Sequence, residues 1–251
     1  KQWYQRRVHG DQPRISSPVP EVALCQMVPN ILDGIPNLQL SSSEFVETST
    51  LLNRMMVARF KHKIPSIDSF DWFVSGRWDL HEWVVVGLQD NRYIMIWFES
   101  EEDLIKAWSK TSHSFNSSHF FLIWRTFNFH MNQDSPASAV WLSFPNIPLP
   151  FQNHFVIRML GNLIGRFLCS DSRTVVVWPP VNPCVCIKVD ASRLPFDYVW
   201  ITIGEEYRWK PRVIYYNWTD FCPFCKCLGH SLVVFRRSRT ESELEDRCRG
   251  T

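Results

Sequence analysis

Two neighbouring runs, Trp83-Val-Val-Val-Gly87 and Arg92-Tyr-Ile-Met-Ile-Trp-Phe98, decide the fold of this chain. Both are rich in β-branched and aromatic residues, which favour strands. The short stretch between them ends in Asp90 and Asn91, residues that suit a tight turn. The pattern predicts a β-hairpin.

Strand and helix signals flank this hairpin on both sides. Residues 55–60 read as a strand, and residues 65–78 begin with Pro-Ser and continue with apolar side chains at helical spacing. Residues 99–110 combine an acidic first turn with an apolar face, which indicates a helix, and residues 120–129 predict another strand. The order β-α-β-β-α-β predicts an α+β fold with a ferredoxin-like unit, or RRM-like unit (after the RNA-recognition motif), over residues 51–130.

A second α+β half is predicted over residues 137–216. Residues 139–144 are strand-like, and residues 151–169 predict a helix with an apolar side. That side consists of Phe155, Val156, Met159, Leu160, Leu163, Ile164 and Phe167. Runs of β-branched or aromatic residues predict further strands at 175–178, 184–189, 198–203 and 212–216.

The segment 217–236 carries a degenerate zinc-knuckle pattern. Cys222, Cys225 and His230 have the spacing of the first three ligands in CX2CX4HX4C, and Gly229 allows a sharp backbone turn before the histidine. The fourth thiolate would fall at position 235, where the chain has Phe235. Structural zinc is held by a closed tetrahedron of four N or S donors. Zinc is therefore the expected cofactor, at a site to which this segment supplies only three of the four donors.

Two other interpretations of this cluster stay open. The residues can have met by chance in a loop, or the open vertex can belong to a catalytic zinc. The chain has no H-E-x-x-H helix. The nucleobase-deaminase pattern also fails, because His81 and Glu82 are adjacent and Phe221, not proline, precedes Cys222.

Composition indicates a packed globular protein. The chain has 251 residues, of which 45% are hydrophobic and 14% aromatic, enough for one large core or two smaller ones. A net charge of +2 is too small to indicate a polyanionic partner, so nucleic-acid binding must rest on local basic patches. Eight scattered cysteines favour reduced thiols and an intracellular location, nucleus or cytoplasm. No signal peptide or membrane span is visible, so no membrane partner is expected.

Both ends of the chain differ from its middle. Prolines and a serine run interrupt every apolar stretch in residues 1–50, which predicts a poorly ordered leader. Residues 237–251 mix arginines with acidic residues and predict a charged tail.

The succession of motifs resembles a family of plant proteins, those carrying domain of unknown function 4283 with a CCHC-type zinc knuckle. The likeness covers roughly residues 51–235. Besides the knuckle, it rests on Ala58-Arg-Phe60, Trp78, Phe98 with its acidic helix, Val140-Trp-Leu-Ser-Phe-Pro-Asn-Ile-Pro148, Leu160-Gly-Asn-Leu-Ile-Gly165 and Cys186-Ile-Lys-Val-Asp190. The resemblance implies a retrotransposon-related nucleic-acid-binding role, with RNA or single-stranded DNA as partner. It also implies zinc on Cys222, Cys225 and His230; the chain departs from the family pattern at Phe235.

Candidate nucleic-acid-binding residues lie in two regions. In an RRM-like sheet, aromatic residues at alternate positions of the third strand stack on bases, and Tyr93 and Trp97 share such a face here. The alternative is that both rings are core. In the knuckle region, Phe224 and Leu228 are expected to meet bases, and just beyond it Arg236 and Arg237 are expected to meet phosphate. The alternative there is packing of the apolar side chains against the second half and solvation of the arginines.

No catalytic motif supports an enzyme. The chain has no G-x-S-x-G elbow, Walker loop or G-x-G-x-x-G, so we expect neither catalysis nor a small-molecule substrate. Two functions from different classes remain: a nucleic-acid-binding protein of plant retroelement type, and a non-catalytic protein-interaction or decayed module. Salt dependence separates them, because contacts to phosphates weaken steeply as salt rises.

Overall fold

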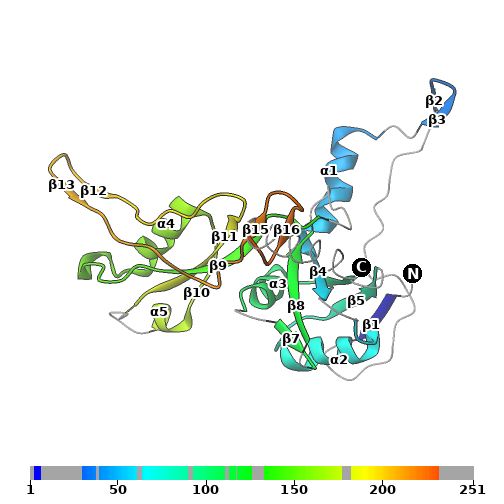
Figure 1. The fold of residues 1–251 in the computed structure, drawn as a ribbon, viewed down its shortest axis with the longest axis horizontal. Helices are drawn as coiled ribbons and strands as arrows, with labels where there is room; N and C mark the ends of the chain where they lie inside the picture. The colour runs from blue at the N-terminus through cyan, green and yellow to red at the C-terminus, as the bar shows by residue number, and fades with distance from the viewer. Residues whose placement is uncertain are drawn as a thin grey trace, which may run out of the picture. The chain divides into compact units, whose positions relative to one another are not determined.

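A computed structural model describes residues 3–6, 30–37, 40–60, 64–89, 93–110, 113–116, 118–125, 133–176 and 182–231. The chain divides into two compact units. Unit 1 comprises Lys1–Lys106 and His113–Asn128, and unit 2 comprises Ala107–Ser112 and Phe129–Thr251. Each unit has its own antiparallel sheet together with short helices (Figure 1), which confirms the predicted α+β class.

Unit 1 is built on a six-stranded sheet in the order β1-β5-β6-β4-β8-β7. Its strands are β1 Trp3–Arg6, β4 Met55–Phe60, β5 Val84–Leu88, β6 Tyr93–Phe98, β7 His113–Phe115 and β8 Ser118–Trp124. Strand β6 pairs antiparallel with both β4 and β5, so those two strands run parallel with β6 between them. This is the arrangement of a split βαβ. The turn between β5 and β6 lies outside the described residues.

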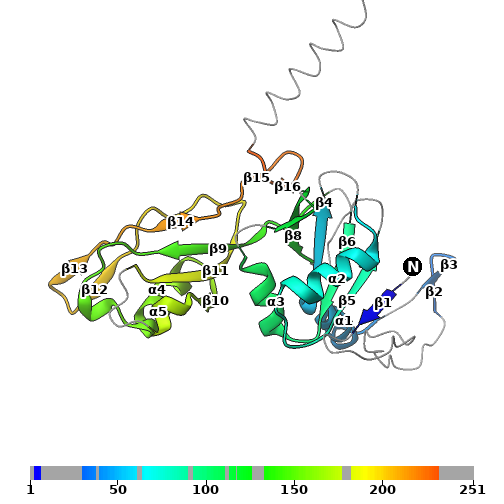
Figure 2. The same cartoon turned by 90° about the horizontal axis from the view of Figure 1, so that it is seen from below.

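Helices α2 (Ile67–Arg77) and α3 (Glu101–Trp108) lie next to each other (Figure 2). Helix α2 begins after Ser66, whose hydroxyl accepts the backbone N–H of Ser69, as the sequence predicts. Its Phe70 ring meets Phe60 of β4 edge to face, with ring centroids 5.4 Å apart. Trp78, at the end of α2, stacks on Phe98 of β6. The sheet face bearing Phe98 therefore meets the helical layer.

Regular elements occur within residues 1–50, where the sequence predicts a poorly ordered leader. Strand β1 pairs with β5 at the edge of the main sheet, where unpaired backbone N–H and C=O groups are available. Two further strands, β2 Asn30–Leu32 and β3 Ile35–Asn37, form a small hairpin, and α1 (Ser42–Thr50) leads into the 3-10 helix η1 (Leu51–Arg54). The expected leader is thus interrupted by regular elements.

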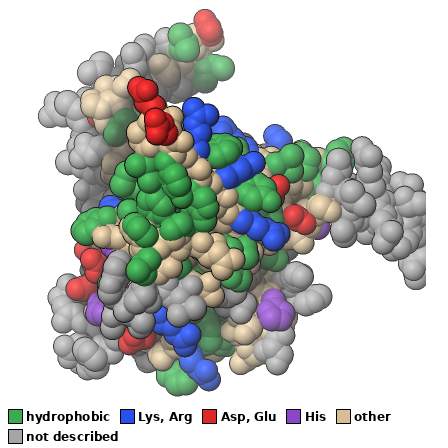
Figure 3. Space-filling model, turned by 90° about the vertical axis from the view of Figure 1, so that its left-hand side faces the viewer, with side chains coloured by type: hydrophobic (Ala, Val, Ile, Leu, Met, Phe, Trp, Pro, Cys, Tyr) green, Lys and Arg blue, Asp and Glu red, His purple; other side chains and the backbone are tan. Residues whose placement is uncertain are grey.

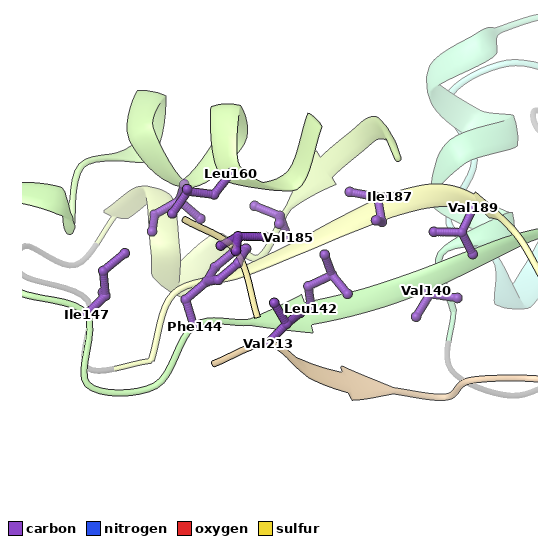
Figure 4. Close-up of a cluster of buried hydrophobic side chains, with 11 residues drawn as sticks. Val140, Leu142, Phe144, Ile147, Leu160, Val185, Ile187, Val189 and Val213 are labelled. Atoms are coloured by element: carbon purple, nitrogen blue, oxygen red, sulfur yellow. The ribbon is translucent and has the colours of Figure 1, made fainter. Parts of the chain in front are cut away.

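Unit 2 is built on a four-stranded sheet in the order β10-β11-β9-β14. Its strands are β9 Ala137–Ser143, β10 Arg166–Ser170, β11 Cys184–Asp190 and β14 Ile214–Tyr216, and its helices are η2 Leu149–Phe151, α4 His154–Ile164 and α5 Ser172–Val176. Side chains from α4 and the sheet form one core (Figure 4), in which Leu160 lies over Val185. Gly161 permits this close approach, because a Cβ there would lie 3.1 Å from a methyl group of Val185.

Two predictions for unit 2 are wrong. The helix expected over residues 151–169 ends at Ile164, and the residues that follow Gly165 form β10. The strand expected at residues 175–178 is replaced by α5, which includes Val175, and residues 177–178 lie outside the described part of the chain. The expected apolar side of α4 does not all face the core: Phe155, Met159 and Leu163 are exposed. An apolar repeat locates a helix, but it does not tell which apolar residues the rest of the fold covers.

Two small hairpins complete unit 2. One pairs β12 (Ile201–Ile203) with β13 (Tyr207–Trp209), and the other pairs β15 (Phe221–Cys222) with β16 (Cys227–Leu228). Among the helices that the structure describes, none is long and apolar enough to cross a membrane.

Candidate metal centre

The knuckle, residues 221–230, is a tight hairpin. Phe221 pairs with Leu228 and Cys222 with Cys227, and the backbone N–H of Lys226 donates to the carbonyl of Cys222 at 2.8 Å. Lys226 has a left-handed φ of 54°, which lets the chain reverse within the turn. The hairpin brings Cys222 and Cys225 to the same place.

Gly229 turns the chain so that His230 returns to the two cysteines. Its φ is 102°, a conformation that favours glycine, and its N–H donates to the carbonyl of Asp220 at 2.8 Å. The expected role of this glycine before the histidine is therefore confirmed. A residue with a Cβ would be strained at this position.

Cys222, Cys225 and His230 form a group that can hold a metal ion. Their donor atoms all lie within 4.8 Å of one another, and Cys225 Sγ lies 3.2 Å from His230 Nε2. Donors of a tetrahedral zinc site at bond lengths of roughly 2.0–2.3 Å are about 3.5–4 Å apart, so the observed separations suit such a site. Cys222 is buried and the other two ligands are half-buried.

The surroundings shift the pKa values of the two thiols in opposite directions. Burial opposes ionisation of Cys222, but hydrogen bonds to its sulfur from the backbone N–H groups of Cys225 and Phe224 and from the Cys225 thiol together outweigh burial, so the pKa of Cys222 is lowered. Burial and the hydrogen bond to Cys222 raise the pKa of Cys225 to about 11. A thiolate is the form that ligates metals, and the N–H groups at Cys222 favour that form.

Asp134 fastens the knuckle to the rest of unit 2. This buried residue precedes β9, and its Oδ2 accepts the backbone N–H of Leu228 at 2.8 Å. Its own N–H donates to the carbonyl of Lys226 at 2.7 Å. Asp134 cannot be identified from the sequence, because its partner lies 94 residues away along the chain. Its only local signal is a place in the polar stretch between the two predicted halves.

No fourth ligand joins the three within the part of the chain that the structure describes. Cys227 Sγ instead donates to the carbonyl of Cys225 at 3.4 Å. Phe235 and Cys248 lie outside the described residues, as do Arg236 and Arg237.

Of the two knuckle side chains expected to meet bases, only one is accessible. Phe224 lies in the turn and is 63% exposed, whereas Leu228 is 5% exposed. Leu228 is paired with Phe221 and its N–H is held by Asp134, so its side chain is part of the knuckle's interior. The expectation that Leu228 contacts nucleic acid is corrected by this burial.

The aromatic residues of β6 are also buried. Tyr93 is 4% exposed and Trp97 is 2% exposed, and the Trp97 ring lies 5.3 Å from that of Trp83. On the same sheet face, Arg125 Nη1 lies 2.6 Å from the sulfur of Met95. Neither Tyr93 nor Trp97 offers a ring for base stacking, so the alternative that both rings are core describes this sheet.

The fold and the site thus define an α+β protein with a Cys-Cys-His knuckle after its second sheet. A family model described as Domain of unknown function (DUF4283) matches residues 48–133. That match supports the resemblance over the segment that contains α2, α3 and the central strands of unit 1. No curated protein matched the chain, and no solved structure matched it.

Proposed function

We propose that this chain binds single-stranded nucleic acid, RNA or DNA, without catalysing a reaction, and that zinc holds the knuckle in its binding conformation. The resemblance to plant retroelement-related proteins supports the same role. The observation that carries the proposal is the exposed Phe224 ring between two residues of a three-donor metal cluster.

Phe224 is suited to stacking because the turn fixes it. Its neighbours in the sequence are Pro223 and the ligand Cys225, and the hairpin closes around it through the Lys226 to Cys222 hydrogen bond. Stacking of one base on an aromatic side chain contributes about 1–3 kcal/mol. Lys226 is exposed in the same turn, and Arg236 and Arg237 follow in the sequence, so cations for phosphate contacts accompany the ring.

Zinc is the proposed metal because of the donor set. Two thiolates and one imidazole suit zinc better than magnesium or calcium, which prefer oxygen ligands. With three protein donors, the fourth position is taken by water or by a residue beyond the described part of the chain. Loss of zinc would release the turn and with it Phe224.

The test is fluorescence anisotropy of the full chain with a labelled single-stranded RNA, and with DNA of the same sequence, at several salt concentrations. We expect Phe224→Ala to weaken binding by about 1–3 kcal/mol with little change in the salt slope. Trp72→Ala is the matched control, since Trp72 is 68% exposed but lies on α2 in unit 1. Zinc removal by a chelator should weaken binding as Phe224→Ala does. Absence of binding at low salt with zinc present would overturn the proposal.

A protein-interaction module is the second candidate, favoured by a different observation. Phe155, Met159 and Leu163 recur at intervals of four residues along α4 and are 71%, 68% and 64% exposed. Such a stripe is typical of surfaces that bind another protein. Binding that depends on these three residues and is insensitive to salt would favour this candidate.

A further inference from the structure

The β12–β13 hairpin is longer than its two named strands. Ile201 pairs with Trp209 and Ile203 with Tyr207, and the same register continues to a bridge between Tyr198 and Arg212. Backbone hydrogen bonds from Val199 to Pro211 and from Val213 to Asp197 extend it further. This single register places Trp200 opposite Lys210.

The two faces of this hairpin differ in chemistry. On the inner face, Val199 and Val213 belong to the core of unit 2, and Ile201 and Trp209 pack against that core. The outer face carries the alternate residues: Tyr198, Trp200 and Thr202 on one strand, and directly opposite them Arg212, Lys210 and Arg208. We call these six residues the outer face of the hairpin. All six are exposed.

The outer face combines open rings with cations. Tyr198 is 47% exposed and Trp200 is 59% exposed. Lys210 Nζ lies 4.5 Å from the centroid of the Tyr198 ring and 5.4 Å from that of Trp200, so one ammonium group contacts both rings. Figure 3, which faces the end of unit 2 with β12 and β13, shows hydrophobic side chains gathered beside Lys and Arg side chains.

Acidic residues lie off this surface. Glu205 and Glu206 are in the turn that closes the hairpin, and Asp197 belongs to the alternate set that includes Val199. The outer face itself therefore carries three positive charges and no negative one.

We propose that the outer face is a second binding surface for single-stranded nucleic acid, on which Tyr198 and Trp200 stack on bases while Arg208, Lys210 and Arg212 contact phosphates. This inference rests on the proposed function, and it replaces Tyr93 and Trp97 as the stacking surface of the protein. A single strand offers unpaired bases and a phosphate at every nucleotide, which match paired rows of rings and cations. An apolar protein partner would instead have to bury three charges without counterions.

The two glutamates limit where a nucleic-acid strand can lie on the hairpin. Because Glu205 and Glu206 repel phosphate, the strand lies across the end of the hairpin near Tyr198 and Arg212 and avoids its tip. From Arg212 the chain runs through β14 to Phe221 and the knuckle, a separation of at most about 30 Å in extended chain. One oligonucleotide of about 16 nucleotides, at the upper end of site sizes for single-strand binders, can therefore reach both surfaces.

The experiment is anisotropy of the full chain with a labelled oligonucleotide of about 16 nucleotides, as RNA and as DNA, at several salt concentrations. Tyr198→Ala with Trp200→Ala should weaken binding at least about tenfold without changing the salt slope. Replacing Trp200 by Phe instead of Ala should keep most of the affinity that Trp200 contributes, because an aromatic ring is retained. Arg208→Gln with Arg212→Gln should reduce the salt slope by about 1.4, that is, about 0.7 for each of two phosphates on a single strand.

The matched control removes two arginines elsewhere in unit 2. Arg173 and Arg193 are exposed and lie outside the outer face, so Arg173→Gln with Arg193→Gln should leave the slope near that of the unchanged protein. Equal slopes for the two double variants would overturn the inference. An unchanged affinity for Tyr198→Ala with Trp200→Ala would also overturn it.

Knuckle variants separate this inference from the proposed function. Binding that falls with Phe224→Ala but not with any change on the outer face refutes only the hairpin surface. Binding that depends on the outer face but not on Phe224 or zinc supports the hairpin surface and refutes the knuckle's role. If the variants weaken RNA binding and DNA binding equally, the protein recognises the bases and phosphates that both nucleic acids share. A preference for RNA would indicate an additional contact to the 2′-hydroxyl. No binding by the unchanged protein refutes both.

Discussion

Asp134 lies outside the metal cluster and anchors the knuckle. Its side chain accepts the N–H of Leu228, and its backbone N–H donates to the carbonyl of Lys226. Asp134 therefore holds the residues on either side of Cys227. Mutation of a residue that orients a metal site without ligating the metal typically lowers metal affinity by about 10–100-fold. A carboxylate accepts a backbone N–H more strongly than a neutral group does.

We therefore expect Asp134→Ala to weaken zinc binding by about tenfold, measured by competition with a chromophoric chelator. Asp220→Asn is the control, because Asp220 contacts the knuckle through its backbone carbonyl and its side chain is exposed. An unchanged affinity for Asp134→Ala would show that the turn holds its ligands without this anchor.

Position 235 gives a second prediction at the residue scale. Adding a thiolate where the CX2CX4HX4C pattern needs one closes the tetrahedron, so Phe235→Cys should tighten zinc binding strongly. Phe235→Ser removes the same ring without adding a strong ligand and should leave the affinity near that of the unchanged chain. Zinc titration of the three proteins in parallel measures this. If the cysteine and serine variants bind zinc equally, the residue at 235 is not what limits affinity.

The ligands could be predicted from the sequence because they lie within nine residues of one another, and turn geometry alone brings them together. Burial could not. Alternation along β6 shows that Tyr93 and Trp97 share a face, but not whether that face is covered. Asp134 escaped notice for the same reason, since its contact joins two distant segments.

At the scale of elements, the prediction was best where the local signal was complete. Strand β4 has the predicted bounds, α2 starts at the predicted serine, and β6 is a strand. Strand β1 could not be predicted because its four residues gain their pairing from β5, far along the chain. The outer face of the β12–β13 hairpin could not be predicted either, because the strand predicted at residues 198–203 shows alternation but not which residues lie opposite it.

Gly165 gives an element-scale prediction. It separates α4 from β10, and a Cβ there would overlap the carbonyl oxygen of Lys188 and lie 3.1 Å from side-chain atoms of Ile187 and Val189. We expect Gly165→Ala to lower the free energy of unfolding by about 1–3 kcal/mol, as overpacking does. Gly76→Ala is the contrasting change. Its Cβ meets nothing within 4 Å on helix α2, so it should raise stability by about 0.4–1 kcal/mol.

Urea unfolding followed by tryptophan fluorescence measures both changes. Opposite signs for the two glycines would support the packing seen at α4 and β11. A neutral Gly165→Ala would mean that the β11 backbone yields at little cost.

At the scale of the whole molecule, the division into two units predicts where the effect of a metal should be felt. All three ligands and Asp134 belong to unit 2, and the core of that unit is closed by its own sheet and α4. Binding energy is available only to the part of the protein that orders the ligands. Metal should therefore stabilise the knuckle and its anchor and leave the sheet of unit 1 unchanged.

Hydrogen exchange followed by mass spectrometry tests this on the full chain, with zinc or with a chelator. At a free zinc concentration of about 100 times the dissociation constant, amides whose exchange requires knuckle opening should exchange about 100-fold more slowly. Protection should appear in residues 220–231 and 133–135, whereas β4 and β6 should exchange at the same rate in both conditions. Cys222→Ser, which removes one ligand, should abolish the difference. Equal protection of both units would contradict the assignment of the metal to unit 2, and no protection anywhere would mean that the three donors do not hold zinc.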